Sequence, residues 1–131
     1  MYCAVSPGIL PEDGALERTR VWRIAGAVLG ALLLSLGSRY RGPGEILVHS
    51  YGSNIAFSFA AYFLVMLSRV RALERIGIAA TVVAVGVSLT EIAQKLKYLD
   101  GVFDSWDLAA NFVGIGLAIV VDSLFAGKRM N

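Results

Sequence analysis

Residues 76–93 read IGIAATVVAVGVSLTEIA, and Glu91 is the first charged residue of the run. An α-helix needs about 20 predominantly apolar residues to cross about 30 Å of hydrocarbon. The apolar residues here form one continuous run instead of a periodic stripe. This stretch therefore predicts a transmembrane helix with its charged end close to one membrane interface.

Three further apolar runs lie along the chain, at residues 21–38, 53–68 and 107–125. They are separated by a linker that holds Gly-Pro-Gly and by a short basic turn, and they lack the short alternating pattern of a membrane β-barrel. Charged residues make up only 17% of the chain, against about a quarter in soluble domains. We therefore predict an all-α membrane protein, a bundle of four transmembrane helices with the N- and C-termini on the same side, in which residues 21–127 form one domain.

The first 20 residues have a mixed composition, with turn signals at Pro7-Gly8 and at Pro11–Gly14. This segment is too long and too acidic for the charged start of a signal peptide. Two interpretations stay open, a disordered tail and a short interfacial helix that begins at Ala15. Arg23, near the start of the first apolar run, is expected to extend its side chain to the interface.

Several kinds of site are not expected. The chain has one cysteine, Cys3, and one histidine, His49, so it can form neither an internal disulfide nor a multi-histidine metal site. The net charge of +2 comes without a basic stripe interleaved with aromatic residues, so nucleic acid is not an expected partner. We predict no cofactor and no bound metal.

Small residues recur at four-residue steps in two of the apolar runs. Gly26 and Gly30 form one such stripe, and Ala110, Gly114 and Ala118 form the other. In lipid, stripes of this kind let helix backbones approach closely. They favour packing within one chain, and a homo-oligomer is the alternative.

The distribution of positive charge predicts the orientation. With four spans, eight cations lie on the side of both termini and four on the other side. Positive charge is enriched on the cytoplasmic side of membrane proteins. We therefore expect a multi-pass protein of the cell membrane with both termini cytoplasmic. The first group is Arg18, Arg20, Arg23, Arg69, Arg71, Arg75, Lys128 and Arg129; the second is Arg39, Arg41, Lys95 and Lys97.

Polar residues gather where the third and fourth spans meet. Glu91 and Gln94 are three residues apart at the end of one predicted helix, and Asp107 and Asn111 are four apart at the start of the next. Asp100-Gly101 predicts the turn between them. Carboxylates and amides are unfavourable in hydrocarbon, so these side chains should point into the bundle, either for binding or for interhelical hydrogen bonds.

Asp104 has a simpler interpretation as the N-cap of the last helix, with Asp107 in the first turn, where negative charge suits the helix dipole.

The stretch TEIAQKLKYLDGVFDSWDLAANFVGIG, residues 90–116, resembles the C-terminal half of the VanZ-like membrane protein family. Val102-Phe103 occupies the place where that family often has an arginine, so an anion-binding role is not carried over. The family is named for a member linked to resistance to the glycopeptide teicoplanin, and the resemblance implies an envelope protein whose candidate binding residues are Glu91, Gln94, Asp104, Asp107, Asn111 and Gly114, with Asn54 from the second span.

Three functions fit these features. The first is a non-enzymatic envelope protein that binds a lipid, a lipid-linked precursor or another amphiphile at the extracytoplasmic polar cluster. The second is a small membrane enzyme that uses Glu91 and Asp107 as paired carboxylates on a lipid substrate. The third is an oligomeric transporter. Since no Ser-His-Asp set, HExxH motif or Walker loop occurs in the sequence, we favour the first.

Overall fold

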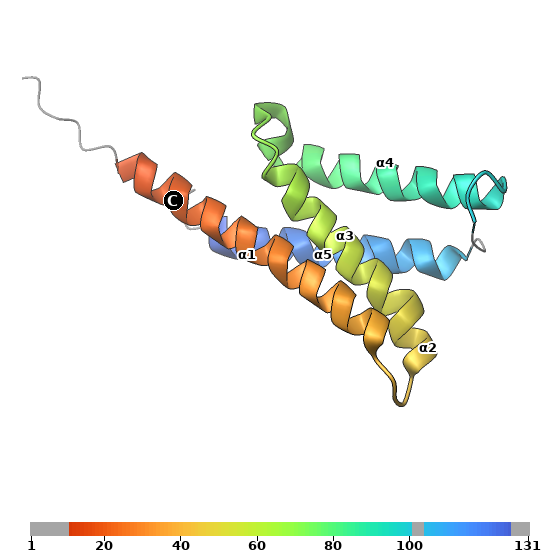
Figure 1. The fold of residues 1–131 in the computed structure, drawn as a ribbon. Helices are drawn as coiled ribbons and strands as arrows, with labels where there is room; N and C mark the ends of the chain where they lie inside the picture. The colour runs from red at the N-terminus through yellow and green to blue at the C-terminus, as the bar shows by residue number, and fades with distance from the viewer. Residues whose placement is uncertain (1–10, 101–103, 127–131) are drawn as a thin grey trace, which may run out of the picture.

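The computed structural model describes residues 11–100 and 104–126 of the chain, and all regular structure in these two ranges is helical (Figure 1). The predictions that concern Cys3, Pro7-Gly8, Gly101, Val102-Phe103, Lys128 and Arg129 fall wholly or partly outside the described residues. The four principal helices are α1 (Pro11–Arg39), α3 (Ser53–Met66), α4 (Ile76–Lys95) and α5 (Ser105–Ala126).

Helix α1 begins earlier than the sequence analysis predicted. The turn expected at Pro11–Gly14 is wrong, because these residues lie in the first turn of α1. Proline is well suited to the first helical turn, where its missing N–H is not needed.

Helical structure also begins earlier than predicted before α3. The one-turn α2 (Glu45–Leu47) passes into a π-helical turn (Val48–Gly52), and this turn continues into α3 without a break. The linker is therefore reduced to the short loop after Arg39. In this loop Tyr40 donates its hydroxyl proton to the carbonyl of Pro43 at 3.1 Å, and Gly44 adopts a left-handed conformation with φ of 73°.

Among the described residues, three helical segments are long and apolar enough to cross a membrane: Leu16–Arg39, Ile76–Lys95 and Ser105–Phe125. With 14 residues, α3 alone would extend only about 21 Å, whereas the continuous helical stretch from residue 45 to residue 66 would extend about 33 Å. The predicted all-helical fold with four principal helices is thus confirmed, and the fourth crossing stays a prediction.

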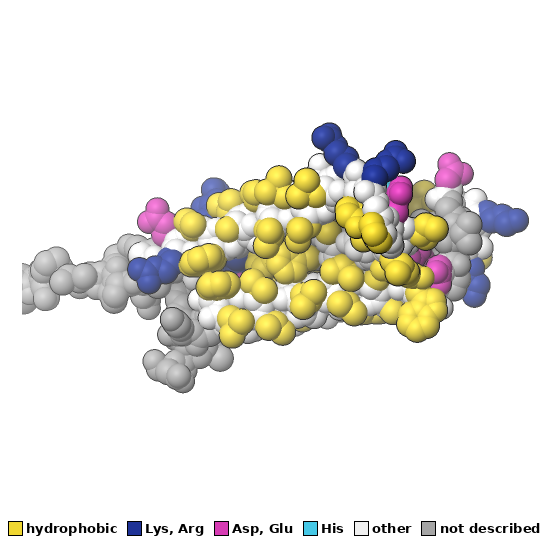
Figure 2. Space-filling model, turned by 90° about the horizontal axis from the view of Figure 1, so that it is seen from below, with side chains coloured by type: hydrophobic (Ala, Val, Ile, Leu, Met, Phe, Trp, Pro, Cys, Tyr) yellow, Lys and Arg dark blue, Asp and Glu magenta, His cyan; other side chains and the backbone are white. Residues whose placement is uncertain are grey.

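The surface agrees with an apolar surrounding. Figure 2 shows hydrophobic side chains along the length of the face in view, while most Lys, Arg, Asp and Glu lie toward the ends. Large exposed apolar side chains occur on each of the four principal helices, for instance Leu32, Leu64, Leu89 and Val120. Soluble monomers rarely expose so much contiguous apolar surface, whereas a membrane protein turns it toward lipid.

Helix α3 lies at the centre of the bundle. It runs antiparallel to α1 and crosses the antiparallel pair α4 and α5, and it packs against all three (Figure 1). Within the described residues, α1 and α4 do not approach each other. The core accordingly forms around the aromatic side chains of α3. Its buried apolar residues are Ala27, Phe59, Tyr62, Phe63, Met66, Ala79, Val83, Val87, Ile115 and Ala118.

Small residues make these close helix contacts possible. A Cβ atom added to Gly30 of α1 would lie 2.7 Å from the Cβ of Ala60. On the other side of α3, a Cβ added to Gly114 of α5 would overlap the carbonyl oxygen of Ile55. Members of both predicted small-residue stripes therefore face α3 of the same chain, so packing within the chain is confirmed.

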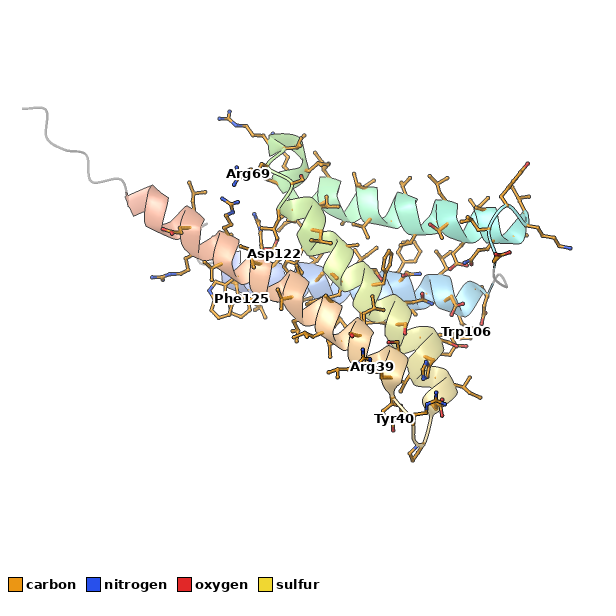
Figure 3. The ribbon with its side chains drawn as sticks, in the orientation of Figure 1. Arg39, Tyr40, Arg69, Trp106, Asp122 and Phe125 are labelled. Atoms are coloured by element: carbon orange, nitrogen blue, oxygen red, sulfur yellow. The ribbon has the colours of Figure 1, made fainter. Side chains whose placement is uncertain are left out.

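An ion pair joins the first and last helices at the end where α1 begins. Arg23 Nε lies 3.1 Å from Asp122 Oδ1, and the hydroxyl of Tyr62 donates to Asp122 Oδ2 at 2.9 Å. Asp122, labelled in Figure 3, is only 3% exposed. The sequence indicates only that Arg23 could extend to the interface, whereas in the structure its guanidinium also pairs with a buried carboxylate. Next to this pair, Trp22 stacks on Phe125 with ring centroids 4.3 Å apart.

We predict that Gly114→Ala lowers the free energy of unfolding by about 1–3 kcal/mol, because the new methyl group would overlap the backbone of α3. Gly116→Ala is the matched control, because nothing lies within 4 Å of a Cβ at that position on the same helix. It should leave stability unchanged or slightly raised. Unfolding of both variants in mixed micelles provides the measurement, and equal losses would contradict the close contact.

We also predict that Arg23→Met lowers the free energy of unfolding by about 2–4 kcal/mol, because it leaves the buried Asp122 without its cation. The double variant Arg23→Met/Asp122→Asn should recover part of this loss. Arg41→Met is the control, since the exposed pair of Arg41 and Glu45, 3.7 Å apart, should contribute about 0–1 kcal/mol. Additive effects of the two buried substitutions would argue against the pair.

Candidate polar site between α3, α4 and α5

At the opposite end of the bundle, three helices bring polar side chains together. Glu91 comes from the last two turns of α4, Asp107 and Asn111 from the start of α5, and Asn54 and Ser58 from the first half of α3. Glu91 is only 6% exposed and Asn111 only 4%. Most of the residues predicted from the sequence therefore do lie around one buried region.

Asn111 connects two helices. The hydroxyl of Ser58 lies 3.0 Å from Asn111 Oδ1 and 2.5 Å from the carbonyl oxygen of Asn54, so its single proton is shared between two acceptors. The amide nitrogen of Asn111 donates to the backbone carbonyl of Asp107 at 3.1 Å. The interpretation of Asn111 as an interhelical hydrogen-bonding residue is confirmed, and its amide is held in a fixed position.

Asp104 caps helix α5, as predicted. Its Oδ1 accepts the backbone N–H of Trp106 at 3.0 Å, and its carbonyl oxygen accepts the N–H of Asp107 at 3.0 Å. Tyr51, from the π-helical turn, lies close enough to the Asp104 carboxylate for the two side chains to interact electrostatically. This contact extends the polar region from the cap toward α3.

Two carboxylate oxygens in this region lack partners. Glu91 Oε2 and Asp107 Oδ1 are both buried, and neither has a hydrogen bond to a described residue. Asp107 interacts with the side chain of Asn54, while the negative charges of Glu91 and Asp107 are close enough to affect each other. Buried acceptors of this kind are unfavourable unless a donor reaches them.

The groups in this site accept hydrogen bonds far more than they donate them. Two carboxylates offer oxygens only, and the amides are already partly engaged. The described residues contain no group of three or more His, Cys, Asp or Glu side chains able to hold a metal ion. The arrangement therefore suits a ligand group with several N–H or O–H donors.

Two predicted residues have other positions or roles. Gln94 is half-buried near the end of α4, and its side chain makes no hydrogen bond to another described residue, although its carbonyl accepts the N–H of Lys97 at 3.1 Å. Gly114 lies at the α3–α5 crossing, where its missing side chain permits the contact with Ile55. Its role in the structure is to set the distance between two helices.

The sequence analysis missed Ser58 and Tyr51. Asn54 and Ser58 are four residues apart, which places both on one face of α3, and this spacing was the available signal. Tyr51 lies in the segment that the sequence predicts as a linker, and its position on a helical turn near Asp104 depends on how the helices pack.

Aromatic residues mark the level of the site along the bundle. Trp106 is 69% exposed at the start of α5, where Figure 3 labels it, and Tyr98 is 81% exposed after the end of α4. Such residues gather at membrane–water interfaces.

Comparison with known proteins adds no homologue: no family model, no curated protein and no solved structure matches the chain.

We predict that Glu91→Gln raises the free energy of unfolding by about 1 kcal/mol, because an amide removes one of two neighbouring buried charges and supplies N–H donors to acceptors that lack them. Glu45→Gln, a more exposed carboxylate at the same end of the bundle, should change stability little. Unfolding in mixed micelles measures both variants. A clear loss of stability in Glu91→Gln would mean that the charge itself supports the fold.

Proposed function

We propose that this chain is a multi-pass membrane protein that binds the donor-rich head group of a lipid or lipid-like amphiphile between α3, α4 and α5. The observation that carries the proposal is a pair of buried oxygens, Glu91 Oε2 and Asp107 Oδ1, that have no hydrogen-bond partner among the described residues. An ammonium or sugar group would supply the missing N–H or O–H donors. A non-enzymatic binding role needs no chemistry beyond these contacts.

The position of the site near one end of the bundle supports a lipid head group as the ligand. Asp104 and Asp107 lie at the beginning of α5, beside the exposed Trp106. A lipid head group occupies this interfacial level while its acyl chains run along the apolar helix faces. The ligand would therefore approach from the membrane, with its polar end against the site.

The proposed topology follows from the helices and the charges. The helical stretch from residue 45 to residue 66 would serve as the fourth crossing, so that α1 begins and α5 ends on the cytoplasmic side. The cations Arg18, Arg20, Arg69, Arg71 and Arg75 would share that side. Glu91 and Asp107 would then face the outer leaflet of the cell membrane.

The VanZ-like resemblance remains part of this proposal, because Glu91, Asp104, Asp107 and Asn111 carry both the resemblance and the site. A link to teicoplanin-type resistance would be one phenotype to examine in cells.

The paired carboxylates also support a second candidate, a membrane enzyme in which Glu91 and Asp107 exchange protons with a lipid substrate. Turnover of a lipid by the purified chain would distinguish it from a binding protein.

We expect the chain, purified from nanodiscs of mixed phosphatidylcholine and phosphatidylethanolamine, to retain the ethanolamine lipid preferentially. The ethanolamine ammonium donates three hydrogen bonds, while the choline group donates none. Glu91→Gln and Asp107→Asn should each reduce this preference about tenfold, the effect of losing one charge-assisted contact. Native mass spectrometry of the retained lipids provides the measurement.

Two controls make the result specific. Glu45→Gln removes a carboxylate at the same end without touching the site and should keep the preference. A neutral glycosyl diacylglycerol, offered in place of the ethanolamine lipid, tests whether sugar hydroxyls can replace the ammonium. If wild type and both site variants retained these lipids equally, the proposal would fail. Since Glu91→Gln is expected to be at least as stable as wild type, unfolding would not explain a loss of lipid binding in that variant.

A further inference from the structure

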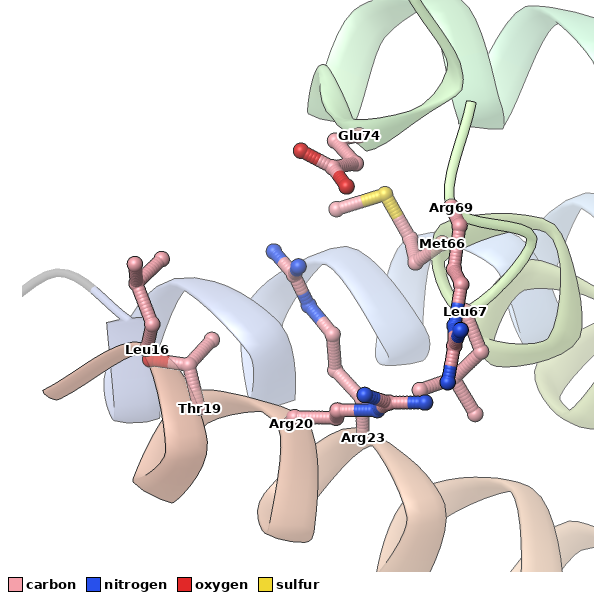
Figure 4. Close-up of a pocket in the computed structure, with 8 residues that line it drawn as sticks. All are labelled: Leu16, Thr19, Arg20, Arg23, Met66, Leu67, Arg69 and Glu74. Carbon is pink, nitrogen blue, oxygen red and sulfur yellow. The ribbon is translucent and has the colours of Figure 1, made fainter. Parts of the chain in front are cut away.

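A pocket lies at the end of the bundle opposite the polar site, next to the Arg23–Asp122 pair. It has a volume of about 310 Å³, at the lower end of the range of about 300–1,000 Å³ for small-molecule sites. In Figure 4, Arg20 and Arg23 of α1 lie around the pocket together with Met66, the last residue of α3, and Arg69 from the loop after α3. Its lining is formed by Leu16, Thr19, Arg20, Arg23, Met66, Leu67, Arg69 and Glu74.

Positive charge exceeds negative charge in this lining. Three guanidinium groups meet one carboxylate, that of Glu74. Within the described residues, neither Arg20 nor Arg69 forms an ion pair, and Arg23 uses its Nε for Asp122, which lies outside the lining. Guanidinium groups that converge without partners indicate a place for an anion.

We infer that this pocket binds a phosphate group, and that in the membrane the phosphate belongs to an anionic phospholipid. Guanidinium groups match the geometry of phosphate oxygens with paired N–H donors. Leu16, Met66 and Leu67 give the same pocket an apolar wall, which suits the glycerol and upper acyl carbons of a lipid. Basic pockets between transmembrane helices are known to hold anionic head groups.

The backbone of Arg69 offers a clean way to test its side chain. Its φ of 62° is left-handed, just after α3 ends, where glycine is the favoured residue. Arg69→Gly therefore removes the guanidinium and suits the backbone at the same time. A loss of ligand in this variant cannot be ascribed to a damaged turn.

The test uses the full chain in nanodiscs of phosphatidylcholine with phosphatidylglycerol. Wild type should retain phosphatidylglycerol preferentially, and Arg20→Gln/Arg69→Gly should lose this preference about tenfold. Arg71→Gln/Arg75→Gln is the matched control, because both arginines lie near the same end but outside the pocket lining. That variant should stay within about twofold of wild type.

A second arm separates the two possible sources of the phosphate. The same proteins, in a neutral detergent without anionic lipid, are titrated with inorganic phosphate by calorimetry. If the chain retains phosphatidylglycerol but shows no heat of binding with inorganic phosphate, the ligand is the lipid. If it binds inorganic phosphate, loses this binding in Arg20→Gln/Arg69→Gly and shows no lipid preference, the pocket is an anion site for a soluble phosphate. Binding of neither probe, or an equal loss in the Arg71→Gln/Arg75→Gln control, overturns the inference, because general surface charge would then explain the result.

Discussion

The close approach of α3 to both α1 and α5 is the contact on which the rest of the structure depends. Gly30 lets α1 reach Ala60, and Gly114 lets α5 reach the backbone of Ile55. Without hydrophobic driving force between helices in lipid, such backbone contact supplies much of the attraction through van der Waals packing. The α3–α5 contact at Gly114 also lies beside Ser58, which reaches Asn111, so the missing side chain of Gly114 helps to set the geometry of the polar site.

The buried carboxylates at the two ends of the bundle differ in whether the described residues supply them with partners. At one end, Asp122 receives Arg23 and the hydroxyl of Tyr62, so its carboxylate is satisfied within the chain. At the other end, Glu91 and Asp107 each keep a carboxylate oxygen without a partner in the described part of the chain. The first arrangement ties α1, α3 and α5 together, whereas the second leaves two acceptors for which the described residues supply no donor. This contrast separates a structural polar cluster from a candidate binding site.

Much of the fold could be predicted from sequence because apolar run length is a direct consequence of bilayer thickness. The spacing of Asp104, Asp107 and Asn111 likewise follows from helix geometry and capping, which are local. The predictions that failed concern contacts between residues far apart in the sequence, or segments with only weak local signals. The sequence predicts the orientation of Arg23 from its place near the start of an apolar run. In the structure, its side chain is held by Asp122, 99 residues further along the chain. The π-helical turn before α3 carries His49, Tyr51 and Gly52, residues that give no strong helical signal of their own.

The separation of the two proposed sites constrains what a ligand can do. Asp107 and Asp122 lie fifteen residues apart on α5, which corresponds to about 22 Å along a helix. A single head group cannot reach both ends, so a donor-rich group at Glu91 and a phosphate at Arg69 must belong to different lipids. Since the anionic lipids of cells are concentrated in the cytoplasmic leaflet, a phosphate pocket on the arginine-rich side fits the proposed orientation. Each end of this small bundle would then recognise the lipids of its own leaflet.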